Sequence, residues 1–290
     1  MALPDSSALN SFSTLLYEEH NGVAWVTLNR PAVYNAMNQT MQTELRTVWR
    51  ALRHRDEVRC VVITGAGDKA FSTGIDRTEQ LGGEADSSGE SLANERAHEH
   101  NIGFGSTPFH YDDLGDYVGP KANDLWKPVI AAVNGMACGG AFYLLGEVEF
   151  VIAADTATFF DPHVTYGMCA TFEPIQMLQK LPFGEVMRMS LLGSHERLSA
   201  ARAHQLGLVS EVVAPDSLRE AAQWAAAAIA SAPALAVQGT VRSLWAGREL
   251  SRSQALGMGW ALVGLGTNDA SLAEGQAAFS SGRRIDWRLR

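Results

Sequence analysis

The stretches ITGAGDKAFSTGID (63–76) and AAVNGMACGGAF (131–142) are two apolar runs that each pass directly into a glycine-rich turn. Glycine lets the backbone approach a ligand closely and direct amide N–H groups outward. Two such turns that converge on one carbonyl oxygen would form an oxyanion hole, which stabilises negative charge developing on that oxygen. Taken alone, buried turns with a purely structural role would explain the glycines equally well.

The rest of the chain places these turns in an α/β protein. From residue 22 to about residue 213, short β-like runs alternate with helical patterns. VAWVTLN (23–29) alternates as a half-buried strand would. CVVIT (60–64) and VIAAV (129–133) are continuous apolar runs, typical of strands covered on both faces.

Helical patterns fill the remaining segments. Asn38 is the predicted N-cap of a helix between the first two strands. Its apolar residues recur at helical spacing: Met41, Leu45, Val48, Trp49 and Leu52. From about Pro215 onward, alanine-rich helical patterns replace the β-like runs. We therefore expect a core over residues 12–214 and a helical subdomain over 215–290.

Composition limits the function classes. With 46% hydrophobic and 19% charged residues, the 290-residue chain can bury a substantial core. A net charge of −9 argues against nonspecific nucleic-acid binding. No apolar run approaches the ~18 residues that cross a bilayer, and the N-terminus does not resemble a secretory signal. Three cysteines (Cys60, Cys138 and Cys169) fit a reducing compartment. We expect a cytoplasmic protein that binds neither nucleic acid nor membranes.

Charge is unevenly distributed. Residues 79–124 carry ten acids against Arg96 and Lys121, within a Gly- and Ser-rich stretch of more than forty residues. Loops of this length are usually functional lids or disordered, so we expect a mobile segment (about 78–124) at the mouth of the site or a solvated insertion. The last ten residues carry four arginines and one aspartate, which should favour a polyanionic ligand.

Other active-site signatures are absent or weak. No serine has glycine two residues away on both sides, so the nucleophile elbow of α/β-hydrolases is missing. The turn at residues 65–70 loosely matches a dinucleotide fingerprint, but no helical pattern follows it. His98 and His100 are two residues apart and do not share a helix face, so we predict no metal site.

Five motifs together resemble the enoyl-CoA hydratase/isomerase family, the crotonases. In order, they are NRPAVYNAMN (29–38), ITGAGDKAFSTGID (63–76), KPVIAAVNGMACGGA (127–141), ERLSAARAHQLGLVSEVV (196–213) and EGQAAFSSGRR (274–284). The resemblance covers roughly residues 15–285, without much of the acidic insertion. It implies an α/β fold with a crotonase-type ββα spiral core and a C-terminal helical oligomerisation subdomain. It also implies an acyl-CoA substrate, no cofactor beyond the coenzyme A of that substrate, and a homotrimer or dimer of trimers.

The same resemblance implies residue roles. The amides of Ile75 and Gly140 would hold the oxygen of a thioester enolate. Residues implied to bind coenzyme A are Val33, Tyr34, Ala36, Arg77, Phe279, Arg283 and Arg284, the last three from the same or a neighbouring subunit. An ordinary charged tail is the alternative explanation of the two terminal arginines.

The sequence departs from the family at its catalytic carboxylates. Family hydratases hold a water between two glutamates, and this chain has Tyr143 and His163 at those positions. Histidine can act as a base near neutral pH, and tyrosine as a hydrogen-bond donor or weak acid. Glu173 stands where the family has a glycine-rich turn, and Pro174 suits the first turn of a following helix. Asp161, expected on the same strand face as His163, would orient it.

We therefore predict an enoyl-CoA hydratase/isomerase-like enzyme in which His163 or Glu173 moves a proton and Tyr143 assists. Structural roles remain open for each of these residues, including wall, cap and core positions. Two other functions also remain open. One is hydrolysis or retro-Claisen cleavage of a β-keto acyl-CoA or cyclic diketone, and the other is acyl-CoA binding with little turnover.

Overall fold

The computed structural model describes residues 9, 11–76, 115–282, 284–285 and 287–290. The predicted features that lie outside these residues are most of the acidic stretch, His98, His100, Arg77 and Arg283.

Within the described residues, six strands form the main sheet, in the order β1-β2-β3-β5-β7-β10. Their bounds are β1 (Leu15–His20), β2 (Val23–Leu28), β3 (Cys60–Gly65), β5 (Val129–Val133), β7 (Phe150–Ala154) and β10 (Glu211–Val213). β1 and β2 are antiparallel, joined by Asn21 and Gly22, which both have positive φ as a tight hairpin turn requires. The other neighbouring strands are parallel. The three predicted strands are confirmed.

A smaller sheet lies beside the main one, in the order β4-β6-β8-β9. Its strands are β4 (Ala70–Ser72), β6 (Met136–Cys138), β8 (Thr158–Phe160) and β9 (Leu198–Ser199). Along the chain, β4, β6 and β8 each follow a strand of the main sheet, namely β3, β5 and β7. The chain therefore steps repeatedly from the end of a main-sheet strand into the small sheet, and the connecting turns gather at one edge.

Helices cover both faces of the main sheet. α2 (Gln39–Leu52) packs in one core cluster and α10 (Leu218–Ala230) in the other. Residues of β3 alternate between the two clusters, with Val61 facing one and Val62 the other, which explains the continuous apolar run. Asn38 caps α2 as predicted, since its side chain accepts a hydrogen bond from the Met41 amide. The predicted α/β class is confirmed.

The remaining helices of the body are short. They are η1 (Pro31–Val33), α5 (Gly115–Val118), α6 (Ala141–Glu147), η2 (His163–Tyr166), α7 (Phe172–Leu178), α8 (Phe183–Leu192), η3 (Gly193–His195), α9 (Ala200–Leu206) and η4 (Pro215–Ser217).

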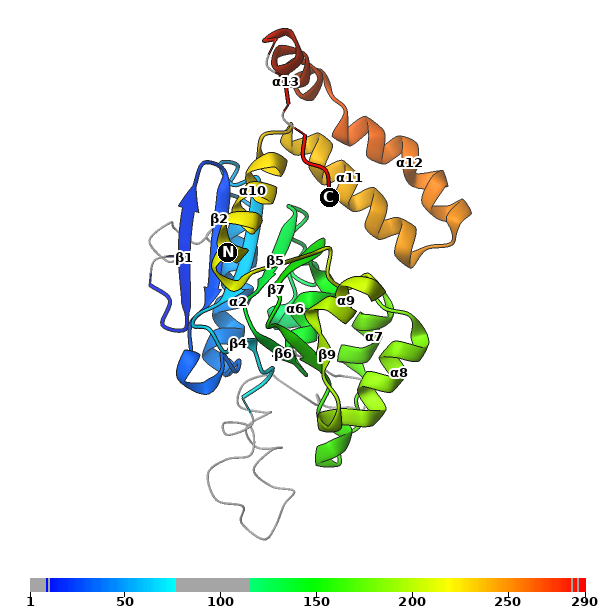
Figure 1. The fold of residues 1–290 in the computed structure, drawn as a ribbon. Coiled ribbons are helices and arrows are strands. Elements are labelled where there is room, and N and C mark those ends of the chain that lie inside the picture. Colours follow the sequence, from blue (N-terminus) through cyan, green and yellow to red (C-terminus); the bar gives the residue numbers. More distant parts are fainter. Residues whose placement is uncertain (1–8, 10, 77–114, 283, 286) are drawn as a thin grey trace, which may run out of the picture.

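Three helices form an arm that projects from the body (Figure 1). They are α11 (Ala234–Glu249), α12 (Arg252–Gly266) and α13 (Asp269–Ser280). α10 packs on the sheet instead, so the predicted division at residue 215 stays a prediction. In the described part of the chain, no single helix is long and apolar enough to cross a membrane. Residues 215–230 (η4 and α10) and α11 together reach that length and hydropathy, but they are bent by 107° relative to each other.

Candidate active site

Two backbone amides, those of Ile75 and Gly140, lie at the ends of the two glycine turns. Met37 forms an isolated parallel bridge with Ile75, in which the Met37 amide donates to the Gly74 carbonyl (2.7 Å) and the Asp76 amide to the Met37 carbonyl (3.0 Å). In this pairing Ile75 directs its own N–H away from Met37. Gly140 is the N-cap of α6. Within the described residues, neither amide donates a hydrogen bond.

The two turns touch. A Cβ at Gly74 would lie 2.5 Å from the Gly140 nitrogen, and a Cβ at Gly140 would lie 3.1 Å from the Ile75 nitrogen. Gly74 has φ +84° and Gly139 has φ +53°, values that L side chains rarely adopt. Glycine is therefore required at Gly74 by both backbone conformation and space, and the two amides lie close enough to share one acceptor.

Two asparagines hold the first turn in place. The Asn35 side-chain amide donates to the carbonyls of Ala66 (3.0 Å) and Ala70 (2.9 Å). The Asn134 amide donates to the Gly67 carbonyl (2.8 Å). Our reading of the sequence missed both positioning residues, although each lies within a motif that carries the family resemblance. For Asn134 the available signal was its position beside Gly135, because an asparagine side chain can satisfy turn carbonyls; Asn35 has no glycine near it in the chain.

An ion pair fixes the segment that follows Ile75. Arg30 bonds Asp76 at 2.7 Å and donates to the Ala36 carbonyl at 2.6 Å. The Asp76 side chain is 7% exposed. This pair ties the first turn to the loop that presents Val33 and Tyr34, which are 42% and 45% exposed. Three of the predicted coenzyme A contacts therefore lie beside the glycine turns.

The placement of Asp161 and His163 on a strand was wrong. β8 ends at Phe160, and Pro162 (φ −85°, ψ −5°) turns the chain into η2, which begins at His163. Proline has no N–H for a strand ladder, so the strand stops before it. The two side chains nevertheless meet. Asp161 Oδ1 accepts from the His163 backbone amide (3.1 Å) and contacts Nδ1 of its ring.

Glu173 lies on the other side of the imidazole. Its Oε1 is 3.4 Å from His163 Nε2, and the residue is 6% exposed in the first turn of α7, as predicted. A Cβ at Gly139 would lie 3.7 Å from His163 Cε1. The imidazole thus stands between two carboxylates and against the second glycine turn. Asp161 is fully buried, and within the described residues its Oδ2 has no hydrogen-bond partner, so its polar contact is directed at His163.

Two other side chains border the second turn. Tyr143 is 2% exposed on α6, three residues beyond Gly140, and packs in the main core cluster. Burial raises the pKa of the Cys138 thiol to about 12, which keeps it protonated and argues against a thiolate nucleophile. Among the residues that the structure describes, no group of three or more His, Cys, Asp or Glu side chains could hold a metal ion.

Phe279 and Arg284 do not reach this site within one chain. Both are exposed, and α13 lies at the far end of the arm from β4 and β6 (Figure 1). Glu274 of α13 pairs with Arg59, which directly precedes β3, at 2.6 Å. The first glycine turn follows the opposite end of β3, so the two regions lie at opposite edges of the sheet.

Comparisons with known sequences and structures all find enoyl-CoA hydratases or isomerases. The family described as enoyl-CoA hydratase/isomerase matches residues 18–102 and 117–290. The chain is 32% identical over 267 residues to (E)-benzylidenesuccinyl-CoA hydratase of Thauera aromatica, covering 92% of this chain and 95% of that one. It is 30% identical over 274 residues to short-chain-enoyl-CoA hydratase of Clostridium acetobutylicum, covering 94% and 97%. The crystal structure of an enoyl-CoA hydratase/isomerase from Mycobacterium paratuberculosis superposes with a TM-score of 0.77 at 34% identity, covering 97% of this chain and 100% of that one.

Proposed function

Because this chain belongs to the enoyl-CoA hydratase/isomerase family, the crotonases, we propose that its chemistry passes through a thioester enolate held by the Ile75 and Gly140 amides. Membership makes it an acyl-CoA-processing enzyme with the crotonase fold. The observation that carries the proposal is the contact between the two turns, where a Cβ added at Gly140 would lie only 3.1 Å from the Ile75 nitrogen. Each such donor contributes about 10²–10³ in rate.

His163 is the proposed proton carrier. With Asp161 accepting from Nδ1, the Nε2 atom lies 3.4 Å from Glu173 Oε1, and the ring Cε1 lies beside the second glycine turn. In the proposed step, the C–H bond next to the thioester carbonyl breaks, its proton goes to Nε2, and the electron pair becomes the enolate. Returning the proton to another carbon completes an isomerisation. Glu173 exchanges the proton with the imidazole, and Tyr143 assists as a hydrogen-bond donor.

Hydration of a simple enoyl-CoA should be slow in this enzyme. A tyrosine and a histidine cannot act as the two carboxylates that hold the water in family hydratases. Hydration of crotonyl-CoA is followed by loss of the enoyl-thioester absorbance, with the Clostridium acetobutylicum hydratase assayed in parallel. We expect turnover at least about a hundredfold lower for this chain, the usual contribution of one general acid–base group. Comparable turnover would contradict the mechanism while leaving the family unaffected.

Hydrolysis or retro-Claisen cleavage is the second candidate. It is favoured by the imidazole between two carboxylates, because such a base can take a proton from water. The resulting hydroxide would attack the β-keto carbonyl, the adjacent C–C bond would break, and the released enolate would be held by the two amides and then protonated. Cleavage of a β-ketoacyl-CoA would give a carboxylate and a shorter acyl-CoA, and cleavage of a cyclic diketone would give an opened ring. Hydrolysis of the thioester itself would release free thiol. Any of these products, formed without added cofactor, would support this candidate. Saturable binding of CoA esters without turnover across this panel would instead support the binding homologue.

Coenzyme A binding is proposed for the loop beside the first turn, at Val33, Tyr34 and Ala36, together with Arg77. No cofactor beyond the coenzyme A of the substrate is required by this chemistry. Phe279, Arg283 and Arg284 would contact the coenzyme A of a neighbouring subunit. The position of α13 at the opposite sheet edge supports that assignment, since the exposed Phe279 lies far from its own site (Figure 1). In a crystal soaked with a short enoyl-CoA, we expect atoms of these residues within about 3.2 Å of the coenzyme A.

Assembly through the arm follows from its exposed apolar side chains. Trp260 is 85% exposed, and Leu265 is 73% exposed on the same helix. Large apolar groups of this kind usually mark an interface. We propose a homotrimer or dimer of trimers, with light scattering expected to give three or six times the 31.3 kDa chain mass. A monomer at micromolar concentration would contradict this assembly. Location in the cytoplasm remains a prediction.

A further inference from the structure

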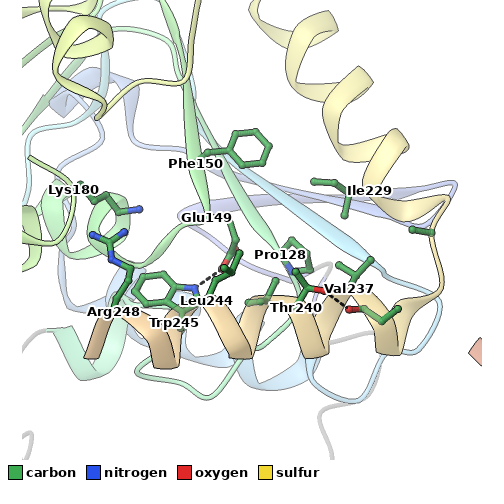
Figure 2. Close-up of a pocket in the computed structure, with 13 residues that line it drawn as sticks. Pro128, Glu149, Phe150, Lys180, Ile229, Val237, Thr240, Leu244, Trp245 and Arg248 are labelled. Atoms are coloured by element: carbon green, nitrogen blue, oxygen red, sulfur yellow. Dashed lines mark hydrogen bonds between the residues drawn. The ribbon is translucent and has the colours of Figure 1, made fainter. Parts of the chain in front are cut away.

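A pocket of about 630 Å³ lies between α11 and the edge of the main sheet where β5 and β7 begin (Figure 2). Pro128 directly precedes β5, and Glu149 directly precedes β7. The second glycine turn lies beyond the other end of β5, which has five residues. A strand of that length spans about 16 Å, so the pocket is separate from the candidate active site.

One wall of the pocket is apolar. α11 contributes side chains spaced by one helical turn, which places them on a single face. They are Ala236, Val237, Thr240, Val241 and Leu244. Phe150 and Ile229 lie across from this face, from β7 and α10 (Figure 2). The volume is within the range of about 300–1,000 Å³ that small-molecule sites occupy.

The other end is cationic. Three cations surround the Trp245 indole, with charged groups 5.9, 5.7 and 5.8 Å from its centroid; this cation cluster consists of Lys121, Lys180 and Arg248. Glu149 is the only carboxylate among the pocket-lining residues of the described chain. It accepts from Trp245 Nε1 at 2.8 Å and pairs with Lys121 at 2.9 Å. The pocket lining therefore holds two positive charges, those of Lys180 and Arg248, and one negative charge, that of Glu149, which is already paired with Lys121.

Two of these cations lack a carboxylate of their own. In the described part of the chain, neither Lys180 nor Arg248 forms an ion pair. Lys180 Nζ donates to the Val148 carbonyl at 2.5 Å. Burial lowers the pKa of Lys180 to about 8, with Arg248 nearby adding to the effect, and burial also lowers the pKa of Arg248. Partly desolvated cations are stabilised by a counter-ion.

We propose that this pocket binds an amphiphilic carboxylate, with its charged group between Lys180 and Arg248 and its hydrocarbon chain along the apolar face of α11. A carboxylate matches the planar guanidinium of Arg248. An inorganic anion would leave the apolar wall in contact with water, and a neutral lipid would leave the cations without a counter-ion. An aliphatic carboxylic acid of medium length satisfies both ends of the pocket.

Isothermal titration calorimetry of the full chain with decanoate at pH 7 tests the proposal. Acetate carries the charge without the hydrocarbon, and 1-decanol carries the hydrocarbon without the charge. We expect decanoate to bind with one site per chain, and both other probes to bind at least about tenfold more weakly, because 1-decanol loses the charge-assisted contact and acetate loses the burial of the hydrocarbon chain. Absence of decanoate binding at millimolar concentration, or equal binding of 1-decanol, would overturn the proposal.

Variants locate the binding. Arg248→Gln removes one exposed cation of the pocket and should weaken decanoate binding about tenfold. Thr240 lines the pocket and is exposed, so the larger side chain of Thr240→Phe should fill the pocket and abolish binding. Arg252→Gln makes the same charge change on α12, outside the pocket lining, and should have no effect. Binding that survives Thr240→Phe lies elsewhere, and binding that Arg248→Gln leaves unchanged does not depend on the cations; either result refutes the assignment.

Discussion

The oxyanion site should be lost when a single methyl group is added at Gly74. A Cβ there would lie 2.5 Å from the Gly140 nitrogen, whereas ordinary contact begins at 3.4 Å. Gly140 must then move by about 0.9 Å, the difference between the two values. A hydrogen bond of about 2.9 Å to the enolate oxygen would lengthen beyond 3.5 Å and cease to stabilise it. Loss of one such donor lowers the rate by about 10²–10³.

Exchange of the protons next to the thioester carbonyl measures enolate formation directly, whatever the natural product is. Butyryl-CoA is incubated with enzyme in D₂O, and deuterium uptake is followed by mass spectrometry. We expect Gly74→Ala to lower the maximal exchange rate by about 10²–10³. The apparent affinity should stay within about threefold, because the amide contact strengthens mainly in the transition state.

Backbone strain alone must be separated from displacement of the amide. Gly207 has φ +93°, and a Cβ there would meet no atom within 4 Å. Gly207→Ala therefore introduces similar strain, about 1–2 kcal/mol, without moving either turn, and should retain the wild-type exchange rate. If Gly74→Ala is folded and exchanges protons within tenfold of wild type, the Ile75 and Gly140 amides do not hold the enolate.

Three further outcomes test other parts of the molecule. His163→Ala should lose at least about a hundredfold in turnover while CoA-ester affinity stays within about tenfold, as titration calorimetry and initial rates will show; a near-wild-type rate would make the residue structural. Changing Arg283 and Arg284 together to glutamine should weaken CoA-ester binding and reduce its dependence on salt concentration. If neither the affinity nor its salt dependence changes, the two arginines belong to an ordinary charged tail. Decanoate affinity should fall between pH 7 and pH 9, because Lys180, whose pKa burial lowers to about 8, loses its proton in that window; the charged groups that act on it are Arg248, Glu149 and Lys121. A constant affinity would exclude a contribution from the lysine.

Regular structure was predictable because it depends on neighbouring residues. The apolar run at residues 60–64 predicts a strand that is buried on both faces of the sheet, and Val61 and Val62 indeed pack in different core clusters. Asn38 could be identified as a cap because the capping bond joins residues three positions apart. The two glycine turns could be identified for the same reason. Their mutual contact was implied by the family resemblance and not by local sequence, because Gly74 and Gly140 are far apart in the chain.

The residues proposed to transfer protons show which contacts local sequence does not predict. Asp161 and His163 were expected to share a strand face, but Pro162 ends the strand and brings them together through a turn. The predicted contact between Asp161 and His163 is nevertheless present, because side chains two residues apart can meet both on a strand face and across a turn. The contact between His163 and Glu173 depends on how η2 leads into α7. That path has no periodicity to read, so the sequence could indicate Glu173 only through its unusual position.

The glycine turns and the pocket lie at opposite ends of the sheet strands, and they differ in how readily the sequence predicts them. At the ends where strands finish, the proposed oxyanion site consists of backbone turns, and a turn needs glycines that stand together in the chain. At the ends where β5 and β7 begin, the pocket depends on side chains from separate segments, and each of Lys121, Lys180 and Arg248 resembles an ordinary surface charge when read alone. Only the docking of α11 against the sheet brings them around Trp245. A site made of turns can thus be recognised by motif, whereas a site made by docking a helix has to be found from its charges and volume.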